Sequence, residues 1–378
     1  MKFLHDLKDN ALDSNGWTMM VPVYSISKAS LNAYTRLLAK KYPEMLINCV
    51  HPSYVSTDMR GILTVEEGAK GPVMLALLQD GGPTGMQVVT GANKGIGLET
   101  VRQLASHGIT VVLTARDETR GTEATRKLHQ LGLSNVIFHQ LDVLDPVSIQ
   151  SLAKFIQDKF GRLDILVNNA GASGVVADEK ALKALNIDTA AWISGKGNHL
   201  VQGIVTHTYE QGEKCINTNY YGVKRVTEAL LPLLQLSPAG TRIVNVSSCS
   251  GALTRIPMNI RNELGDIKVL NEGRIDEILL KFLHDFKDNA LESCGWTMMA
   301  PAYSISKASL NAYTRILAKK CPEMVINCVH PGYVSTDMTW HGGILTVEEG
   351  AKGPVMLALL QDGGPTGCYF DRTQQAEF

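Results

Sequence analysis

The spacing of hydrophobic and polar residues follows a regular alternation from about residue 87 onward. Short apolar runs rich in Val and Ile are each followed by a segment whose apolar residues recur with the period of a helix. Strands that are apolar throughout and separated by helices are typical of a parallel sheet covered on both faces. The pattern therefore predicts an α/β fold, a doubly wound parallel sheet.

The predicted elements are defined by residue range. Strands are expected at 87–91, 109–116, 135–143, 163–171, 242–248, 325–332 and 368–371. Helices are expected at 95–108, 118–132, 145–161, 222–236, 275–292, 304–320 and 347–360. Two long stretches, 172–212 and 249–300, interrupt the alternation at the ends of strands, where such folds carry lids and binding surfaces.

One segment of the chain occurs twice. Residues 3–59 match residues 282–338 with nine differences, and residues 61–85 are identical to 343–367. Between these two stretches the first copy has Arg60 where the second has Thr339, Trp340, His341 and Gly342. A single repeat at this separation is a partial duplication and not a solenoid, whose units recur every 20 to 50 residues or so.

The first copy lacks most of a working site. It contains Tyr24 and Lys28 but no glycine-rich turn, and Ser53 replaces Gly332. We therefore expect residues 1–86 to be a loosely attached, partly helical, non-catalytic appendage, and residues 87–378 to form a complete domain. An alternative is that the first copy competes with its twin for one strand position. A further alternative is that the chain joins separate coding segments by fusion.

Composition narrows the classes of partner. The formal charge of −1, from 36 basic and 37 acidic residues, gives no electrostatic reason to expect nucleic acid. No apolar run approaches about 18 residues and the N-terminal segment lacks the apolar centre of a signal peptide, so we expect no membrane partner and a cytoplasmic location. The seven cysteines are scattered and form no C-x-x-C pair, which predicts reduced thiols and no metal site.

A glycine-rich turn follows the first predicted strand, with Gly91, Gly95 and Gly97 in the sequence TGANKGIG. Glycines at this point let the backbone approach a pyrophosphate at the N-terminus of a helix, as in a Rossmann-type fold. At the end of the second strand stands Arg116, where an NAD site usually has an acidic residue. Arg116 and Lys94 together are suited to hold a 2′-phosphate, so NADP(H) is preferred over NAD(H). Two solvated cations are the alternative interpretation.

Tyr303 and Lys307 lie four residues apart, on one face of a predicted helix. A phenol with a pKa of about 10 is a weak acid at neutral pH, and a neighbouring ammonium lowers that pKa. Such a pair is suited to act as a general acid and the group that tunes it, whereas on its own it is equally typical of a helix surface. Asp142 follows the third strand and could contact an adenine amino group or cap the next helix.

These motifs, with NNAG at residues 168–171, occur in the order and spacing of the short-chain dehydrogenase/reductase family. Residues 87–378 resemble that family throughout, and most of all its monomeric plant menthone/neomenthol and salutaridine reductases and the animal carbonyl reductases. The resemblance implies a catalytic set of Asn219, Ser248, Tyr303 and Lys307. In that set Ser248 binds the substrate oxygen, Lys307 grips the nicotinamide ribose, and Asn219 holds a water that connects Lys307 to solvent.

The resemblance also implies the residues that contact the cofactor. Beyond Tyr303 and Lys307 these are Gly91, Asn93, Lys94, Gly95, Ile96, Gly97, Arg116, Asp142, Val143, Asn169, Pro331, Gly332, Val334 and Thr336. The insertion at 249–300 resembles a segment that covers the tetramer face of other members, which predicts a monomer.

The expected function is NADPH-dependent interconversion of a hydrophobic ketone and its secondary alcohol. The presence of Tyr303 favours carbonyl chemistry over reduction of a carbon–carbon double bond. The alternative is a non-catalytic dinucleotide-binding or scaffold protein, disabled by a first strand that the junction leaves short.

Overall fold

The computed structural model describes residues 28, 30–32, 34–35, 85–184, 201, 203–237 and 240–378. Contacts divide the chain into two units, Met1–Gly82 and Pro83–Phe378. The described residues of the first unit are helical, and the Thr35 hydroxyl donates to the Leu31 carbonyl at 2.9 Å. The other predictions for the first copy, including Tyr24 and the competition between the two copies, lie outside the described residues.

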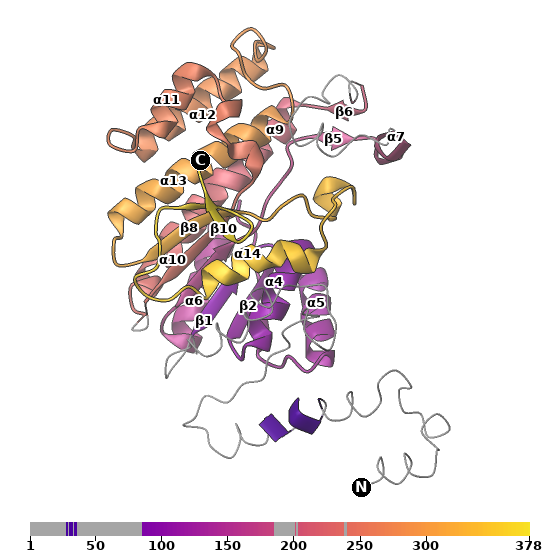
Figure 1. Ribbon diagram of the computed structural model, residues 1–378, viewed down its shortest axis with the longest axis vertical. Helices are drawn as coiled ribbons and strands as arrows, with labels where there is room; N and C mark the ends of the chain where they lie inside the picture. Colours follow the sequence, from indigo (N-terminus) through magenta and orange to yellow (C-terminus); the bar gives the residue numbers. More distant parts are fainter. Residues whose placement is uncertain are drawn as a thin grey trace, which may run out of the picture. The chain divides into compact units, whose positions relative to one another are not determined.

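The second unit is built on an eight-stranded sheet in the order β10-β9-β8-β7-β4-β1-β2-β3 (Figure 1). Seven strands run parallel, whereas β10 pairs with β9 antiparallel at one edge. The doubly wound α/β prediction is confirmed, with this antiparallel edge strand as an addition. The strands are β1 Met86–Val89, β2 Thr110–Ala115, β3 Val136–Gln140, β4 Ile165–Asn168, β7 Arg242–Val246, β8 Val325–His330, β9 Tyr369–Asp371 and β10 Gln374–Ala376.

Strand β1 has four residues, yet it pairs with β2 on one side and β4 on the other. Asp164 holds its first residue. The Met86 amide donates to Asp164 Oδ2 at 2.7 Å, and the Asp164 amide donates to the Met86 carbonyl at 3.0 Å. The Ser237 hydroxyl and Arg162 Nε bond the other carboxylate oxygen of Asp164, at 2.6 and 3.2 Å. A side-chain clamp thus secures the strand where the sequence before it reads as a turn.

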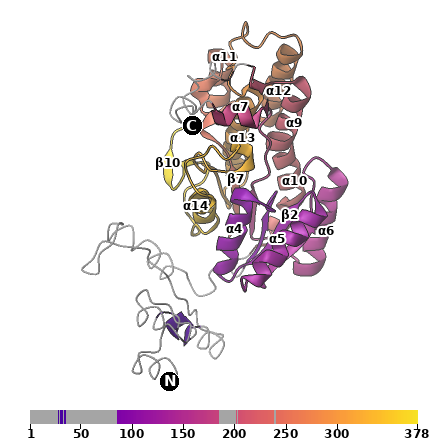
Figure 2. The ribbon, with the colours of Figure 1, turned by 90° about the vertical axis from the view of Figure 1, so that its right-hand side faces the viewer.

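Helices cover both faces of the sheet (Figure 2). Alternate strand residues face opposite sides, so Val88 packs in one core and Val89 in the other. One core contains residues of α4 Gly95–Ser106, α5 Glu118–Gln130 and α14 Val347–Ala358. The other contains residues of α6 Pro146–Phe160, α9 Tyr209–Ile216, α10 Val223–Leu234, α11 Met258–Gly265, α12 Glu272–Lys287 and α13 Pro301–Lys320.

Several helices begin where the sequence supplies a capping side chain. Asp117, Asp145, Asn271 and Thr346 each accept a backbone N–H of the turn that follows, at the starts of α5, α6, α12 and α14. None of the described helices is long and apolar enough to cross a membrane.

The two long connections carry structure of their own. The 172–212 stretch contains a small antiparallel pair and a short helix, namely β5 Val176–Ala177, β6 Val205–Thr206 and α7 Glu179–Ala184. The 249–300 insertion contains α11, α12 and the 3₁₀ turns η3 Cys249–Gly251 and η4 Leu253–Arg255. On α12, Glu272 pairs with Lys224 of α10 and Lys320 of α13, which ties the insertion to the sheet-covering helices.

Candidate active site

The glycine-rich turn between β1 and α4 packs closely against the segment that follows β4. A Cβ on Gly97 would lie 2.4 Å from the side-chain nitrogen Nδ2 of Asn169. Gly91 has a φ of +61°, and a Cβ there would lie 2.9 Å from the Ala170 Cα. The N-cap residue Lys94 makes no side-chain cap, and the first turn of α4 has no acidic residue. The backbone N–H groups of the first turn of α4 have no side-chain cap and carry the positive end of the helix dipole, which suits a phosphate anion. This part of the chain therefore fits a dinucleotide.

Two cations stand at this end of the site. Arg116 directly follows β2 and is exposed, and within the described part of the chain no carboxylate pairs with it. Lys94 Nζ pairs with Asp337 Oδ2 at 2.5 Å, and both side chains are 58% exposed. This partner was not foreseen. Because the pair is exposed, it is weak enough for a phosphate to replace Asp337 at Lys94.

Other predicted cofactor contacts have structural partners. Asn169 Nδ2 donates to the carbonyls of Thr90 and Gly91 at 2.9 and 3.1 Å, which fixes the turn. Asp142 lies two residues beyond β3, and its Oδ1 accepts the Leu144 amide at 2.9 Å. Asp145, not Asp142, caps α6. Val143 is buried, 8% exposed, and packs in the core.

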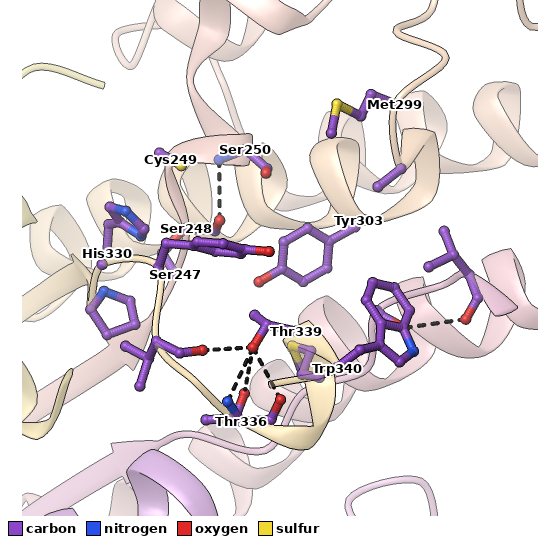
Figure 3. A pocket seen from close by; sticks show the side chains of 18 of the residues that line it. Ser247, Ser248, Cys249, Ser250, Met299, Tyr303, His330, Thr336, Thr339 and Trp340 are labelled. Atoms are coloured by element: carbon purple, nitrogen blue, oxygen red, sulfur yellow. Dashed lines mark hydrogen bonds between the residues drawn. The ribbon is translucent and has the colours of Figure 1, made fainter. Parts of the chain in front are cut away.

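Three serines follow β7, and the structure separates their roles. Ser247 is buried and its hydroxyl donates to Asn311 Oδ1 at 2.5 Å, so it serves packing. Ser248 Oγ accepts the Ser250 amide at 3.1 Å, and its hydroxyl is near enough to the Tyr303 phenol to lower the phenol's pKa. Ser248 is therefore the serine placed to share a substrate oxygen with Tyr303 (Figure 3).

Tyr303 and Lys307 stand on α13 as expected, but their electrostatics differ from the prediction. Burial raises the pKa of the Tyr303 phenol, and the nearby Ser248 hydroxyl opposes that shift. The expected lowering of the Tyr303 pKa by Lys307 is absent. Burial lowers the pKa of Lys307 to about 8, and its Nζ donates to the Val246 carbonyl at 2.7 Å, 5.7 Å from the Tyr303 ring centroid. The Lys307 ammonium is thus hydrogen-bonded to the last residue of β7.

Asn219 lies in a π-helical turn, η2 Asn217–Gly222, between α9 and α10. Its side chain is completely buried and bonds both backbone groups of Ala172, with Oδ1 accepting at 2.8 Å and Nδ2 donating at 2.9 Å. Nδ2 also lies 3.0 Å from the Ser306 hydroxyl on α13. Asn219 therefore joins the end of β4 to the catalytic helix, and its water-holding role stays a prediction.

The loop after β8 brings the remaining predicted contacts over the turn. Gly332 has a φ of +92° and a Cβ there would lie 2.3 Å from Leu345 Cδ1, so the position requires glycine. Pro331 and Val334 are buried. A Cβ on Gly95 would lie 3.4 Å from Thr336 Cγ2. The loop and the glycine-rich turn thus meet, which places Ile96 and Thr336 on one cavity wall.

That cavity has a volume of about 180 Å³ and lies in front of Tyr303 (Figure 3). Its walls come from the ends of β7 and β8, the β5–β6 segment, the start of α13 and the loop after β8. The stretches 172–212 and 249–300, expected to carry binding surfaces, contribute Val175, Val201, Val205, His207 and Met299, among others. Outside these stretches, sequence reasoning missed His330, Tyr333, Met338, Thr339 and Trp340. Trp340 had a signal in the sequence, because the four-residue insertion that contains it is absent from the first copy.

Thr339 organises this insertion. It ends the 3₁₀ turn η5 Asp337–Thr339, and its hydroxyl donates to the Val334 carbonyl at 2.7 Å and accepts the Thr336 amide at 3.1 Å. Trp340 and His341 follow with φ of +49° and +60°. This left-handed backbone conformation costs energy in residues other than glycine. The hydrogen bonds of Thr339 help to maintain it and so hold Trp340 at the cavity wall. Within the described residues no cluster of three metal-ligating side chains occurs.

Comparison with known proteins gives a consistent result. The short chain dehydrogenase family model matches residues 86–260. A (+)-neomenthol dehydrogenase of Arabidopsis thaliana is 51% identical over 77% of this chain and 97% of its own length. Carbonyl reductase [NADPH] 3 of Rattus norvegicus is 37% identical over 72% of this chain and 90% of its own. The solved structure of salutaridine reductase from Papaver somniferum is 48% identical, covers 76% of this chain and 99% of its own, and has a TM-score of 0.71. The chain belongs to the short-chain dehydrogenase/reductase family.

Proposed function

We propose that the chain is an NADPH-dependent reductase that interconverts a hydrophobic ketone and its secondary alcohol. The observation that carries the proposal is that the Tyr303 phenol and Ser248 line one cavity, which adjoins the glycine-rich turn. Oxidoreductases of this family use a nicotinamide dinucleotide, and terpenoid and alkaloid reductases are among the similar proteins.

The preference for the 2′-phosphorylated cofactor rests on Lys94 and Arg116. Both cations stand at the end of the site where a ribose phosphate would lie, and no acidic residue takes the place of Arg116 after β2. The similar carbonyl reductase of Rattus norvegicus has NADPH in its name, which agrees with this preference. Lys94 would exchange Asp337 for the phosphate.

The cofactor supplies a hydride, and the chain supplies the proton and the positioning. In reduction the Tyr303 hydroxyl would give its proton to the carbonyl oxygen of the ketone, whose carbon would receive the hydride that the bound cofactor supplies. Ser248 donates a hydrogen bond to that oxygen as negative charge develops. At neutral pH the Tyr303 phenol carries the proton that a general acid gives up, and burial, which raises its pKa, makes it a weaker acid than a phenol in water.

Tyr303→Phe tests this assignment. The variant keeps the ring but loses the proton donor, and we expect kcat for ketone reduction to fall by about 10²-fold or more. Loss of NADPH absorbance with menthone and with aromatic ketones measures the activity. NADPH binding, followed by fluorescence, should remain, which separates loss of the acid from loss of the site. Full activity of the variant would show that Tyr303 is not the acid.

The alternative of a non-catalytic dinucleotide-binding protein rested on a damaged first strand. Strand β1 is short but paired on both sides, and we keep the reductase as the proposal. We further propose a monomeric, cytoplasmic protein, with the insertion that contains α11 and α12 packed over α13. Sedimentation of the purified full chain would test the monomer.

A further inference from the structure

His330 is the last residue of β8, and it stands beside the proposed substrate-binding serine. The neighbouring residue Val329 accepts the Ser247 amide at 2.7 Å, so the two strand ends lie side by side. Figure 3 places His330 on the Ser247–Ser248 side of Tyr303, and His330 lines the cavity. Its side chain has been given no task by the reaction described above.

The imidazole lacks the partners that a buried ring normally has. In the portion of the chain that the structure describes, neither ring nitrogen is hydrogen-bonded, and Nδ1 is buried. Burial lowers the pKa of His330 to about 4. The positive charges of Arg372 and Arg255 lower this pKa further, and the negative charge of Asp371 raises it. The ring is therefore neutral near pH 7 and offers Nε2, either as donor or as acceptor, to a ligand in the cavity.

Met299 and Trp340 form an apolar wall across Tyr303 from His330 (Figure 3), and Val175 and Val205 also line the cavity. A ketone held at Tyr303 and Ser248 would thus place its bulk against the apolar wall. The substituent on the other side of its carbonyl would then face His330.

We propose that His330 is a specificity-determining residue whose Nε2 hydrogen-bonds an uncharged hydroxyl or carbonyl oxygen on the carbon next to the reacting carbonyl. The inference rests on the proposed function and narrows its substrate to α-oxygenated ketones with a hydrophobic body. A substrate that lacks the second oxygen leaves a polar nitrogen unpaired in the cavity, and such a mismatch discriminates strongly.

The test uses a matched pair of ketones, acetophenone and 2-hydroxyacetophenone, with the full-length protein and NADPH. The measured quantity is the ratio of kcat/KM for the hydroxyketone to that for the plain ketone. His330→Gln places a polar atom near the position of Nε2, whereas His330→Asn places one near Nδ1 and His330→Leu places none. We expect the ratio to fall about tenfold or more in the Leu and Asn variants and to stay within about threefold in the Gln variant.

Rescue by Gln and not by Asn distinguishes a contact to substrate from a structural role. His207→Leu is the matched control, since His207 also lines the cavity with an unpaired, buried Nδ1. A ratio that is insensitive to residue 330, or that falls in the His207 variant instead, would overturn the inference while leaving the reductase in place. A wild type that reduces neither ketone would overturn the proposed function, and this inference with it.

Discussion

At the scale of single residues, buried polar groups either serve the fold or are left without partners. Asn245 shows the first case, since its Oδ1 accepts from Asn168 Nδ2 and its Nδ2 donates to the Thr314 hydroxyl, both at 2.9 Å. Gln87 shows the second. It is fully buried in β1, between Val111 and Ile165, and neither Oε1 nor Nε2 has a hydrogen-bond partner.

Gln87→Met should therefore stabilise the protein. Methionine keeps the length of the unbranched side chain and removes two unpaired polar atoms, so we expect the free energy of unfolding to rise by about 1–3 kcal/mol. Chemical denaturation followed by circular dichroism measures the change. Gln150→Met on the exposed face of α6 is the control and should shift stability by less than about 0.5 kcal/mol. Equal effects at both positions would contradict the explanation.

Lys307 predicts a pH dependence of stability. Its folded pKa of about 8 lies below the ordinary lysine value of 10.5, so its burial destabilises the fold most below pH 8, where both states are protonated. Between these two values the unfolded state binds more protons, and stability rises with pH. Relative to Lys307→Met, the wild type should gain up to about 3 kcal/mol from pH of about 7 to about 10.5. A difference that is constant with pH would contradict the shift.

At the scale of elements, the loop after β8 has a natural variant within the same chain. The first copy has Ser53 at the position of Gly332 and Arg60 in place of residues 339–342. Gly332 combines a positive φ with a close approach to Leu345, and Thr339 supplies the bonds that order the turn. The first copy thus differs from the second at the two points that shape this loop.

Gly332→Ser introduces the residue of the first copy, and we expect it to weaken NADPH binding and lower Tm. Gly363→Ser is the matched control, because Gly363 also has a positive φ, +75°, but a Cβ there would have no neighbouring atom within 4 Å. The control should cost only the backbone strain, about 1–2 kcal/mol, whereas Gly332→Ser adds the clash with Leu345. Titration of NADPH fluorescence and thermal melts distinguish the two. Indistinguishable variants would show that the clash relaxes without cost.

The sequence predicted the elements with strong periodicity and some of the residues that line the cavity, among them Ser248, Tyr303 and Thr336. The strands before the glycine-rich turn and around Ser248, and the helix of Tyr303 and Lys307, follow from apolar runs and helical spacing. The antiparallel β10, a run of three exposed residues, carries no apolar signal. The π-helical turn of Asn219 and the position of His330 depend on contacts between distant segments. Burial also reversed the expected pKa shift of Tyr303, and a sequence does not show burial at that level.

At the scale of the whole molecule, the compact second unit contains all the proposed catalytic residues. We predict that limited proteolysis of the full chain leaves a fragment that begins between about residues 83 and 86 and retains NADPH-dependent ketone reduction, because exposed junctions are cut before packed strands. Mass spectrometry of the protected fragment gives its first residue. A protected core that starts well before Met86 would contradict the loosely attached appendage.

The Asp164 clamp has a consequence for how this chain could have arisen and how it can be engineered. The carboxylate and backbone of Asp164 satisfy the first residue of β1 from within the second unit. We expect a recombination event that exchanges the chain before residue 85 to leave these contacts in place. The same junction is accordingly the position at which a reporter or affinity module can be fused with least disturbance.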